Sequence, residues 1–329
     1  MTKYFLGVDV GGTKSHALVV DETGQALGSG VSGAGNYEIV GYQGLIETLN
    51  LITDEALLKA GVSKDQLVGA GFGVAGYDWP VEREPTLQAI QTLGLSIPFE
   101  FVNDAVIGLL AGAEEGWGVA VVAGTSNNCR GRDRQGREGR VTGCGPWLGE
   151  YGGASELVGR AIQAVAKAWT QRAPATRLTE IFVDLTGATD VMDLLEGLAM
   201  ESYHLSALVA PVIFQAAAEG DEVAQEIIRW AGRELGSLAV GVIHQLGFEK
   251  LDFEVVLIGS LFKGSPTLIE TMTTIIHQVA PRARLVRLKA PPVVGGVLLG
   301  MEHVGFKYSS VRQRLIESTN VILNSEAAA

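Results

Sequence analysis

A glycine-rich segment near the N-terminus contains residue types that commonly contact phosphate groups. Gly11, Gly12, Thr13 and Lys14 directly follow a short apolar run that includes Asp9. Glycine N–H groups can approach a phosphate without a Cβ in the way, and the threonine hydroxyl adds a further donor. A carboxylate in the position of Asp9 could hold Mg²⁺ beside the phosphates, chiefly through water. The segment therefore predicts a phosphate site, although a plain tight turn capped by Asp9 fits one such segment equally well.

Two common nucleotide motifs do not explain this segment. In a P-loop, G-x-x-x-x-G-K-[ST], lysine follows the second glycine directly, whereas Thr13 separates Gly12 from Lys14. A P-loop also continues into a helix, and residues 15–22, SHALVVDE, are typical of a strand. The segment likewise lacks the dinucleotide fingerprint G-x-G-x-x-G. The remaining design is a phosphate-binding loop at the tip of a β-hairpin.

The same pattern returns later in the chain. Gly124, Thr125 and Ser126 follow a second apolar run, WGVAVVA. After each threonine, an aspartate comes eight residues later and a glycine eleven residues later. Each copy thus reads as strand, Gly-Thr turn, strand and Asp-x-x-Gly turn. This self-similarity predicts two related α/β domains, and it favours the phosphate interpretation for both hairpins.

A carboxylate lies between the two copies, where the apolar segment IPFEFVND ends and an apolar helical segment begins. Asp104 could simply cap that helix. Because it falls where the two domains should meet, it could instead accept the proton of a hydroxyl group to which phosphate is transferred. Its neighbour Asn103 could fix this carboxylate or bind an adjacent hydroxyl.

The elements that must position these residues are visible as apolar runs between turn residues. Strands are predicted over residues 4–12, 15–22, 67–76, 97–104 and 253–262, and helices over residues 41–61, 154–169 and 212–247. We expect an N-terminal domain over residues 1–113 and a C-terminal domain over residues 114–305. A C-terminal helix and tail are expected over residues 306–329.

The composition favours an ordinary two-domain protein without membrane or nucleic-acid partners. The 329 residues are 47% hydrophobic and carry a formal net charge of −12, which disfavours a nucleic-acid surface. The arginine-rich stretch from Arg130 to Arg140 is expected to be a solvated hairpin tip or a subunit contact. Two cysteines are too few for a disulfide framework or a four-thiolate metal site. With no signal peptide and no apolar run of membrane-spanning length, we expect a cytoplasmic protein.

Several short motifs together resemble one enzyme superfamily. DVGGTKS, VNDA, VAGTSNNC, GCGPWLGEYGG, VLIGSLF and PPVVGG occur in the order found in the actin-like sugar kinase and acetate kinase superfamily. Within it, residues from about 4 to about 300 most resemble N-acetylglucosamine kinases of the BadF/BadG/BcrA/BcrD ATPase group. The resemblance implies two related actin-like (ribonuclease H-like) α/β domains with an interdomain cleft. It also implies ATP and Mg²⁺ as cofactors, a sugar substrate, and a homodimer, which is ordinary for relatives.

The resemblance also assigns roles to single positions. Asp104 matches the general base that accepts the proton of the sugar 6-hydroxyl, and Asp9 matches the carboxylate near Mg²⁺. Asn36 matches an asparagine that contacts sugar hydroxyls, and Asn103 is expected to assist there. The positions that match ATP-binding segments are Gly11, Gly12, Thr13, Lys14, Gly124, Thr125, Ser126, Gly259 and Ser260, followed by the glycine pair Gly295-Gly296.

The segment GCGPWLGEYGGAS departs from these relatives, which commonly read G-D-E-G-S near the sugar. Glu150 stands where they have aspartate, and it can still accept hydrogen bonds from sugar hydroxyls with a reach longer by one methylene. Trp147 could form a wall against the sugar, or it could pack the loop down. The sugar is therefore left open. N-acetylglucosamine is expected, and N-acetylmuramate, glucosamine, N-acetylmannosamine and glucose are alternatives.

Other classes of the superfamily fit the residues less well. Sugar kinases of the repressor/kinase group carry a cysteine-rich zinc motif that Cys129 and Cys144 cannot supply. Dehydratase activators bridge an iron–sulfur cluster with cysteines between the phosphate loops, but Cys144 lies in the sugar motif. A non-catalytic sensor of nucleotide or amino sugar is the alternative outside enzymes, and the presence of Asp104 favours the enzyme.

Overall fold

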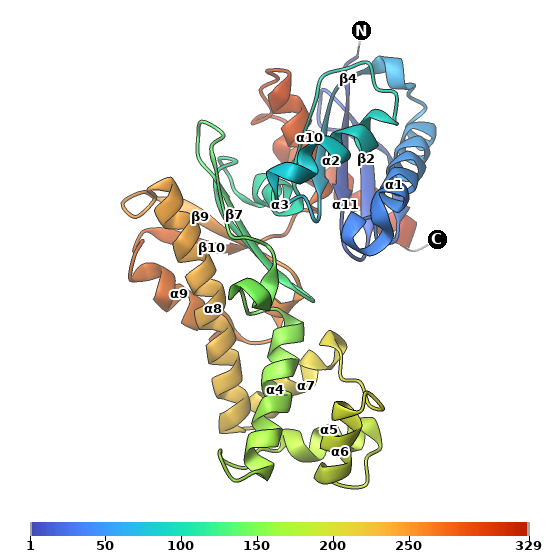
Figure 1. The fold of residues 1–329 in the computed structure, drawn as a ribbon. Helices are drawn as coiled ribbons and strands as arrows, with labels where there is room; N and C mark the ends of the chain where they lie inside the picture. Colours follow the sequence, from blue (N-terminus) through green and yellow to red (C-terminus); the bar gives the residue numbers. More distant parts are fainter. Residues whose placement is uncertain (1, 328–329) are drawn as a thin grey trace.

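Two five-stranded sheets form the frame of the protein in the computed structural model, which describes residues 2–327 (Figure 1). The strand order is β3-β2-β1-β4-β5 in the first sheet and β10-β9-β6-β7-β8 in the second. The strands of the first sheet are β1 (Tyr4–Val10), β2 (Ser15–Asp21), β3 (Ala26–Ser32), β4 (Leu67–Val74) and β5 (Phe99–Asn103). Those of the second sheet are β6 (Gly118–Ala123), β7 (Asn127–Arg132), β8 (Glu138–Arg140), β9 (Phe253–Ile258) and β10 (Ala283–Arg287).

Both sheets have the same topology. β1 pairs antiparallel with β2 and parallel with β4, and β6 pairs antiparallel with β7 and parallel with β9. Read from β8 to β10, the second sheet repeats the order of the first. The pair of related α/β halves predicted from the repeated Gly-Thr pattern is therefore confirmed. Each half begins with a hairpin whose turn holds one copy of that pattern.

One face of the first sheet is covered by α1 (Tyr37–Ala60), whose buried residues recur along one side of the helix. Leu45 and Ile52 belong to the same core cluster as apolar residues of β1 and β4. Glycine in β3 lets the helix approach closely, because a Cβ on Gly30 would lie 2.0 Å from the carbonyl oxygen of Ile52. The short helix α2 (Arg83–Gln91) packs against α1.

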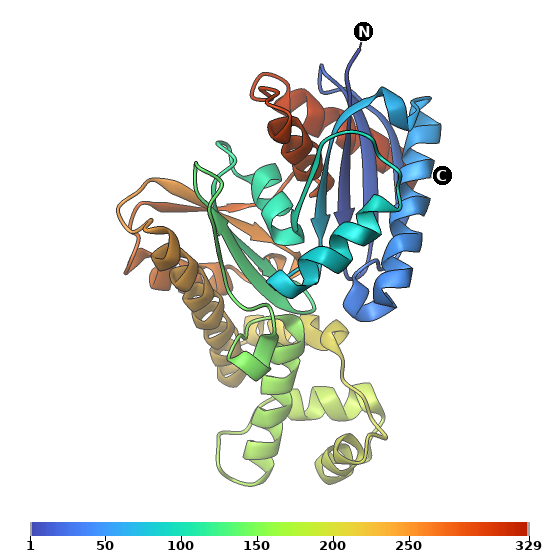
Figure 2. The same ribbon diagram turned by 45° about the horizontal axis from the view of Figure 1, so that its top comes forward.

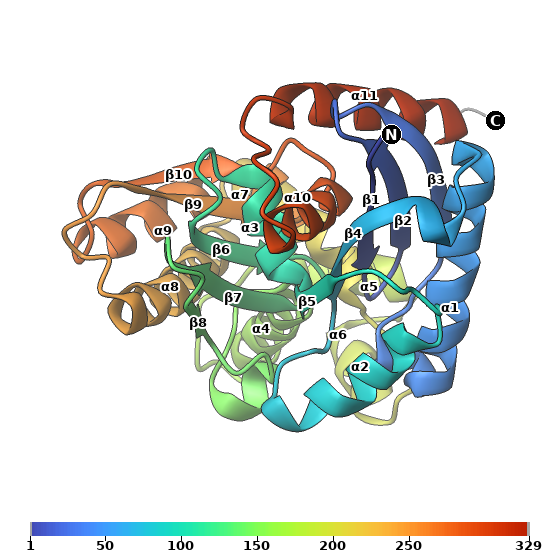
Figure 3. The same cartoon turned by 90° about the horizontal axis from the view of Figure 1, so that it is seen from above.

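Two helices from distant parts of the chain, α3 (Asp104–Gly112) and α10 (Val293–His303), lie between the two sheets (Figures 2 and 3). α10 packs on β1 and β4, and α3 packs on α10 and on β6 of the second sheet. The helices meet backbone to backbone, because a Cβ on Gly295 would lie 1.8 Å from the carbonyl oxygen of Ile107. α3 is thus held on both sides, with its first residue, Asp104, at the junction of the halves.

The last helix, α11 (Arg312–Ala327), also covers the first half. Leu315 is buried in one cluster with strand residues of β2, and the Ser318 hydroxyl accepts a 3.0 Å hydrogen bond from the Ala26 N–H. The chain from Val293 onward therefore packs on the first half, and this segment includes residues 293–305 of the C-terminal domain expected from sequence. The boundaries of the two domains themselves stay a prediction.

The second half carries a helical extension that projects away from both sheets (Figure 1). Two helices, α8 and α9, pack beside the second sheet, and α4 to α7 build the extension. Their bounds are α4 (Ala154–Trp169), α5 (Leu178–Thr186), α6 (Val191–Ala199), α7 (Ala210–Ala218), α8 (Glu222–Leu246) and α9 (Pro266–His277). Short 3₁₀ turns are η1 (Lys64–Gln66), η2 (Pro80–Glu82), η3 (Gly145–Leu148), η4 (Ala207–Val209) and η5 (Ser260–Lys263). Within residues 2–327, no helix combines the length and apolar character needed to cross a membrane.

Candidate active site

The first predicted phosphate loop is the turn between β1 and β2. Gly12, Thr13 and Lys14 are exposed there, so their donor groups are open to a ligand. Gly11 closes the turn tightly, because a Cβ on it would lie 2.5 Å from the carbonyl oxygen of Lys14. The Gly11 carbonyl also accepts hydrogen bonds from the N–H groups of Gly35 and Asn36, at 3.0 and 3.3 Å. These bonds hold Asn36 beside the loop.

The second predicted phosphate loop, Gly124–Ser126, connects β6 and β7 and meets the start of α4. The N–H groups of Ala154 and Ser155 donate to the carbonyl oxygens of Gly124 and Thr125, at 2.9 and 3.0 Å. The N-terminus of α4 is therefore fixed against this loop. Because a helix N-terminus carries a partial positive charge, its position favours an anion bound at the loop.

The predicted adenosine segment lies directly beside the second loop. Gly259 has a φ of 114° and follows β9, with Ser260 opening η5. A Cβ on Gly259 would lie 2.2 Å from the carbonyl oxygen of Ala123, the last residue of β6 before the loop. The structure thus brings these two sequence-predicted segments together. The pair Gly295-Gly296 serves the packing of α10 on α3 and β1.

Asn103, and not Asp104, is the N-cap of α3. Its Oδ1 accepts from the Ala105 N–H at 3.0 Å and from the Asn128 Nδ2 at 3.3 Å, while its Nδ2 donates to the Tyr77 carbonyl and to Asp78 Oδ1, both at 3.2 Å. The side chain is 2% exposed, and its donors and acceptors are all engaged. Asn103 is therefore the residue that caps α3, and the carboxylate of the next residue, Asp104, shares the Ala105 N–H through its Oδ1 at 2.9 Å.

Two carboxylates at this point have strongly raised pKa values. Burial, and then the negative charge of Asp78, raises the pKa of Asp104 to about 6. Burial, and then the charge of Asp104, raises the pKa of Asp9 to about 8. The structure therefore brings Asp9 and Asp104 close enough to influence each other's charge. Such a pair of acids with separated pKa values is typical of catalytic sites.

The same pair fits a magnesium ion that is bound mainly by phosphates and water. No group of three or more His, Cys, Asp or Glu side chains able to hold a metal occurs among the described residues. Mg²⁺ commonly uses one or two carboxylates together with substrate phosphates, and that pattern needs no larger protein cage. A cation beside Asp9 would also offset the unfavourable burial of its negative charge.

A buried ion pair joins the two halves beside Asp104. Arg130 of β7, which is 2% exposed, pairs with Asp78 in the segment after β4. The expectation that the arginine-rich stretch forms only an exposed tip or subunit contact is wrong for Arg130. It is also wrong for Arg132, which forms a two-bond pair with Glu302 of α10 at 2.7 and 3.0 Å. These side chains face the first half because β7 crosses next to it.

Sequence reasoning missed three residues of this site, namely Asp78, Asn128 and Arg130. A usable signal existed on β7, because residues two apart on a strand point to the same face. Asn128 and Arg130 alternate in this way and contact Asn103 and Asp78, respectively. Asp78 carried no such signal, since it lies in an irregular segment.

The predicted sugar loop contains two candidate substrate contacts, of which Glu150 is buried and Trp147 is exposed. Glu150 is 6% exposed; its Oε1 accepts from the Thr142 N–H at 2.5 Å, and its Oε2 is buried without a protein partner. A buried acceptor without a partner is costly, so a hydrogen-bond donor that reached this oxygen would be favourable. Trp147 is 89% exposed, so in this structure it does not pack the loop down.

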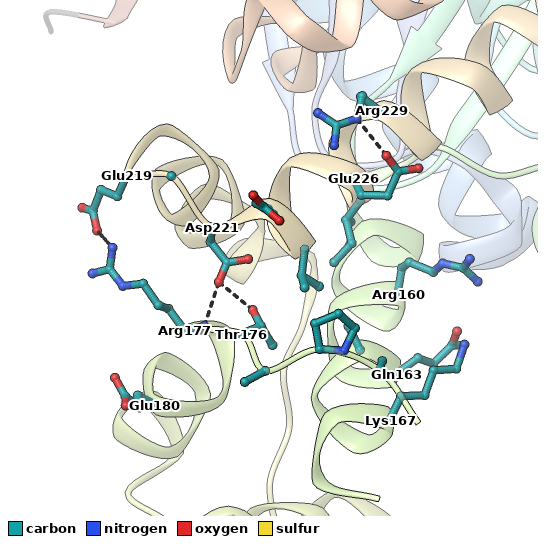
Figure 4. A pocket seen from close by; sticks show the side chains of 18 residues that line it. Arg160, Gln163, Lys167, Thr176, Arg177, Glu180, Glu219, Asp221, Glu226 and Arg229 are labelled. Carbon is teal, nitrogen blue, oxygen red and sulfur yellow. Dashed lines mark hydrogen bonds and ion pairs between the residues drawn. The ribbon is translucent and has the colours of Figure 1, made fainter. Parts of the chain in front are cut away.

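A separate pocket of about 880 Å³ opens in the helical extension (Figure 4). Its charged side chains largely satisfy one another. Asp221 accepts from the Thr176 hydroxyl and the Arg177 N–H at 2.9 and 2.7 Å, and Arg177 pairs with Glu219 at 2.8 Å. None of the predicted site residues lines this pocket. The predicted base, Asp104, lies instead at the junction of the halves.

Comparisons with known proteins agree with this arrangement. The sequence pattern of the BadF/BadG/BcrA/BcrD ATPase family matches residues 6–300. An N-acetyl-D-glucosamine kinase from Dictyostelium discoideum is 29% identical over 316 residues, covering 90% of this chain and 97% of the relative. An N-acetylmuramic acid/N-acetylglucosamine kinase from Clostridium acetobutylicum is 25% identical over 300 residues, covering 90% of this chain and 98% of the relative.

Two solved structures show the same fold. A candidate N-acetylglucosamine kinase from Chromobacterium violaceum matches with a TM-score of 0.65 at 22% identity, covering 90% of this chain and 98% of that one. A ROK family glucokinase from Streptomyces griseus, solved with glucose and AMPPNP, matches with a TM-score of 0.56 at 19% identity. The latter match covers 91% of this chain and 99% of that one. The predicted fold of two actin-like α/β domains is confirmed.

Proposed function

Because the chain belongs to the BadF/BadG/BcrA/BcrD ATPase family, we propose that it transfers the γ-phosphate of ATP to the 6-hydroxyl of N-acetylglucosamine. The chain is an ATP-dependent sugar phosphotransferase, a class to which both curated relatives belong. The observation that carries the proposal is the Asp104 carboxylate, which stands at the junction of two halves that each present a Gly-Thr loop.

The two loops are proposed to hold the phosphates of ATP. Thr13, Lys14, Thr125 and Ser126 are exposed at the loop tips, where they can donate to phosphate oxygens. Gly259 and Ser260 would lie against the adenosine, since they adjoin the end of β6 next to the second loop. Gly11, Gly12 and Gly124 contribute close backbone approach. Magnesium bound near Asp9 would neutralise charge on the phosphates during transfer.

Asp104 is proposed to act as the general base. Its carboxylate takes the proton of the sugar hydroxyl as the bond from that oxygen to the γ-phosphorus forms and the bond to the ADP oxygen breaks. Asn103 caps the first turn of α3 by accepting from the Ala105 N–H. Three further hydrogen bonds, to Tyr77, Asp78 and Asn128, fix the Asn103 side chain, and so it helps to orient the neighbouring base. We propose this positioning role for Asn103 in place of the sugar contact expected from sequence, because its buried side chain already uses its donors and acceptors within the protein.

The sugar is proposed to lie between Asn36 and Glu150. The Glu150 Oε2 is a buried acceptor without a partner and would take a hydrogen bond from a sugar hydroxyl. Asn36 lies beside Gly76. Gly76 begins the short segment that leads to Asp78. Trp147 would cover an apolar face of the sugar when the halves close. A homodimer remains a prediction.

The test is ADP release from MgATP with a panel of sugars. The panel contains N-acetylglucosamine, N-acetylmuramate, glucosamine, N-acetylmannosamine and glucose, and the relative from Clostridium acetobutylicum is named for two of these. We expect N-acetylglucosamine to give the highest kcat/KM, and Asp104→Asn to lower kcat by about two to four orders of magnitude. Nuclear magnetic resonance of the product would locate the phosphate on the sugar. Full activity of Asp104→Asn would remove the base from the mechanism, and binding of ATP without turnover would favour a sensor.

A further inference from the structure

The proposed sugar loop and the second phosphate loop are in direct backbone contact. Gly153 ends the sugar loop, and a Cβ on it would lie 2.7 Å from the carbonyl carbon of Ser126. The first two N–H groups of α4 bind the carbonyl oxygens of Gly124 and Thr125, as described above. A displacement of one loop must therefore move the other or break these contacts.

One side chain reinforces this contact from behind. The Glu156 Oε2, in the first turn of α4, accepts from the Gly153 N–H at 2.7 Å and from the Asn127 Nδ2 at 3.3 Å. Gly153 belongs to the sugar loop, and Asn127 directly follows the phosphate loop. A single carboxylate oxygen thus connects the two loops. A carboxylate at this position often bonds back to the N-cap N–H, but the bond to Asn127 is an addition that helix capping does not require.

The burial of Asn127 also supports a role for this link. It is 5% exposed, and its Oδ1 has no partner, so its burial leaves a polar atom unsatisfied. An apolar residue at position 127 would leave no buried polar atom unsatisfied, and it would therefore cost less free energy of folding. The asparagine gains only its Nδ2 bond to Glu156, which indicates that the bond serves the arrangement of the loops.

We propose that Glu156 is a positioning residue that couples the two substrate sites, so that sugar bound at Glu150 favours the ATP-binding form of the Gly124–Ser126 loop. The inference rests on the proposed function, because it takes the two loops as sugar and phosphate sites. By linkage, the coupling is reciprocal, and ATP strengthens sugar binding by the same factor.

The experiment measures the Kd of Mg-AMPPNP with and without saturating N-acetylglucosamine. In the wild type we expect sugar to lower this Kd by about 5- to 150-fold, the usual range of coupling between sites. Glu156→Ala should reduce that factor to below about 2-fold, while the sugar's own Kd in the absence of nucleotide changes little. Asn127→Ala should reduce it likewise at little cost in Tm. The double variant should show no further loss, because both residues act through one bond.

Glu222→Ala is the matched control, since Glu222 is an exposed glutamate in the first turn of α8. It should keep the wild-type coupling factor. Wild-type coupling in Asn127→Ala, or in a folded Glu156→Ala, would overturn the inference, and so would a wild type without coupling. If Glu156→Ala does not fold, Asn127→Ala decides the question. A wild type that binds both ligands without releasing ADP would instead contradict the proposed function.

Discussion

At the scale of single residues, the charge of Asp104 should set the pH range of activity. A general base must be deprotonated, and burial together with Asp78 raises the pKa of Asp104 to about 6. We therefore expect kcat/KM to be at its plateau above that value and to fall about tenfold per pH unit below it. A pH profile with N-acetylglucosamine as the varied substrate checks this. An acid limb near pH 4, the ordinary range of aspartate, would contradict the assigned environment.

Asp78→Asn should move that acid limb to lower pH. The substitution removes a negative charge that raises the pKa of Asp104, and it leaves the positive charge of Arg130, which lowers that pKa, without its partner. Both changes act in the same direction. The pH profile of kcat/KM measures the shift, with Asp65→Asn, at an exposed site in η1, as the control. A limb that stays in place or moves to higher pH would exclude this electrostatic link.

Single residues were predictable where a local pattern marked them. The Gly-Thr loops and Asp104 follow apolar strands, so their place at the sheet ends could be read from the sequence. Asp78 and Arg130 could not, because they stand 52 residues apart and only the association of the two halves pairs them. Whether Asp9, Asn36, Trp147 and Glu150 contact substrates stays a prediction that the proposed assays test.

At the scale of elements, the contact between sugar loop and phosphate loop depends on a glycine. Gly153→Ala would place a Cβ 2.6 Å from the Glu156 Oε2 and 2.7 Å from the Ser126 carbonyl carbon, so the two loops must separate. We expect kcat/KM to fall by at least about tenfold, the equivalent of about 1.4 kcal/mol of lost positioning. Gly159→Ala is the control within the same helix, where a Cβ would meet nothing within 4 Å. It should keep activity and stabilise α4 by up to about 1 kcal/mol. Equal activity of both variants would contradict the prediction.

Elements with clear periodicity were predicted, and their irregular ends were not. The helix expected over residues 41–61 corresponds to the regular part of α1, which has a non-helical Gly41 at φ 70° and ψ 170° and one further turn before it. The long helix expected over residues 212–247 is two helices, α7 and α8, separated by Glu219, Gly220 and Asp221. Gly220 has a positive φ, and Asp221 caps α8, so these residues end one helix and start the next.

At the scale of the whole molecule, α10 joins the first sheet to the helix that carries Asp104. Gly295→Ala would drive a Cβ to 1.8 Å from the Ile107 carbonyl oxygen, and backbone atoms cannot yield as a flexible side chain does. We expect a loss of at least about 1–3 kcal/mol in the free energy of unfolding, as for other overpacked cores. Thermal unfolding should show a lower Tm, and Gly241→Ala, in open space within α8, should not lower it. An unchanged Tm in Gly295→Ala would refute this tight crossing.

The internal repeat made the two-half architecture predictable, because it repeats a pattern of strands and turns along the chain. The return of α10 and α11 to the first sheet was not predictable in the same way. The apolar sequence VVGGVLLGM predicts a buried helix, but it does not indicate which sheet that helix packs on. That choice is made by long-range contacts, among them the glycines of β1 and β4 that admit α10.

The late return of the chain has a consequence for biosynthesis. One face of the first sheet is covered by α10, which begins at Val293, and apolar residues of β1 and β2 share their core cluster with this helix. While a ribosome is still translating the second half, α10 cannot yet cover that face. The emerging polypeptide then exposes apolar surface of the kind that chaperones bind. We therefore expect the N-terminal half, although it is made first, to complete its native packing only after the final helices leave the ribosome.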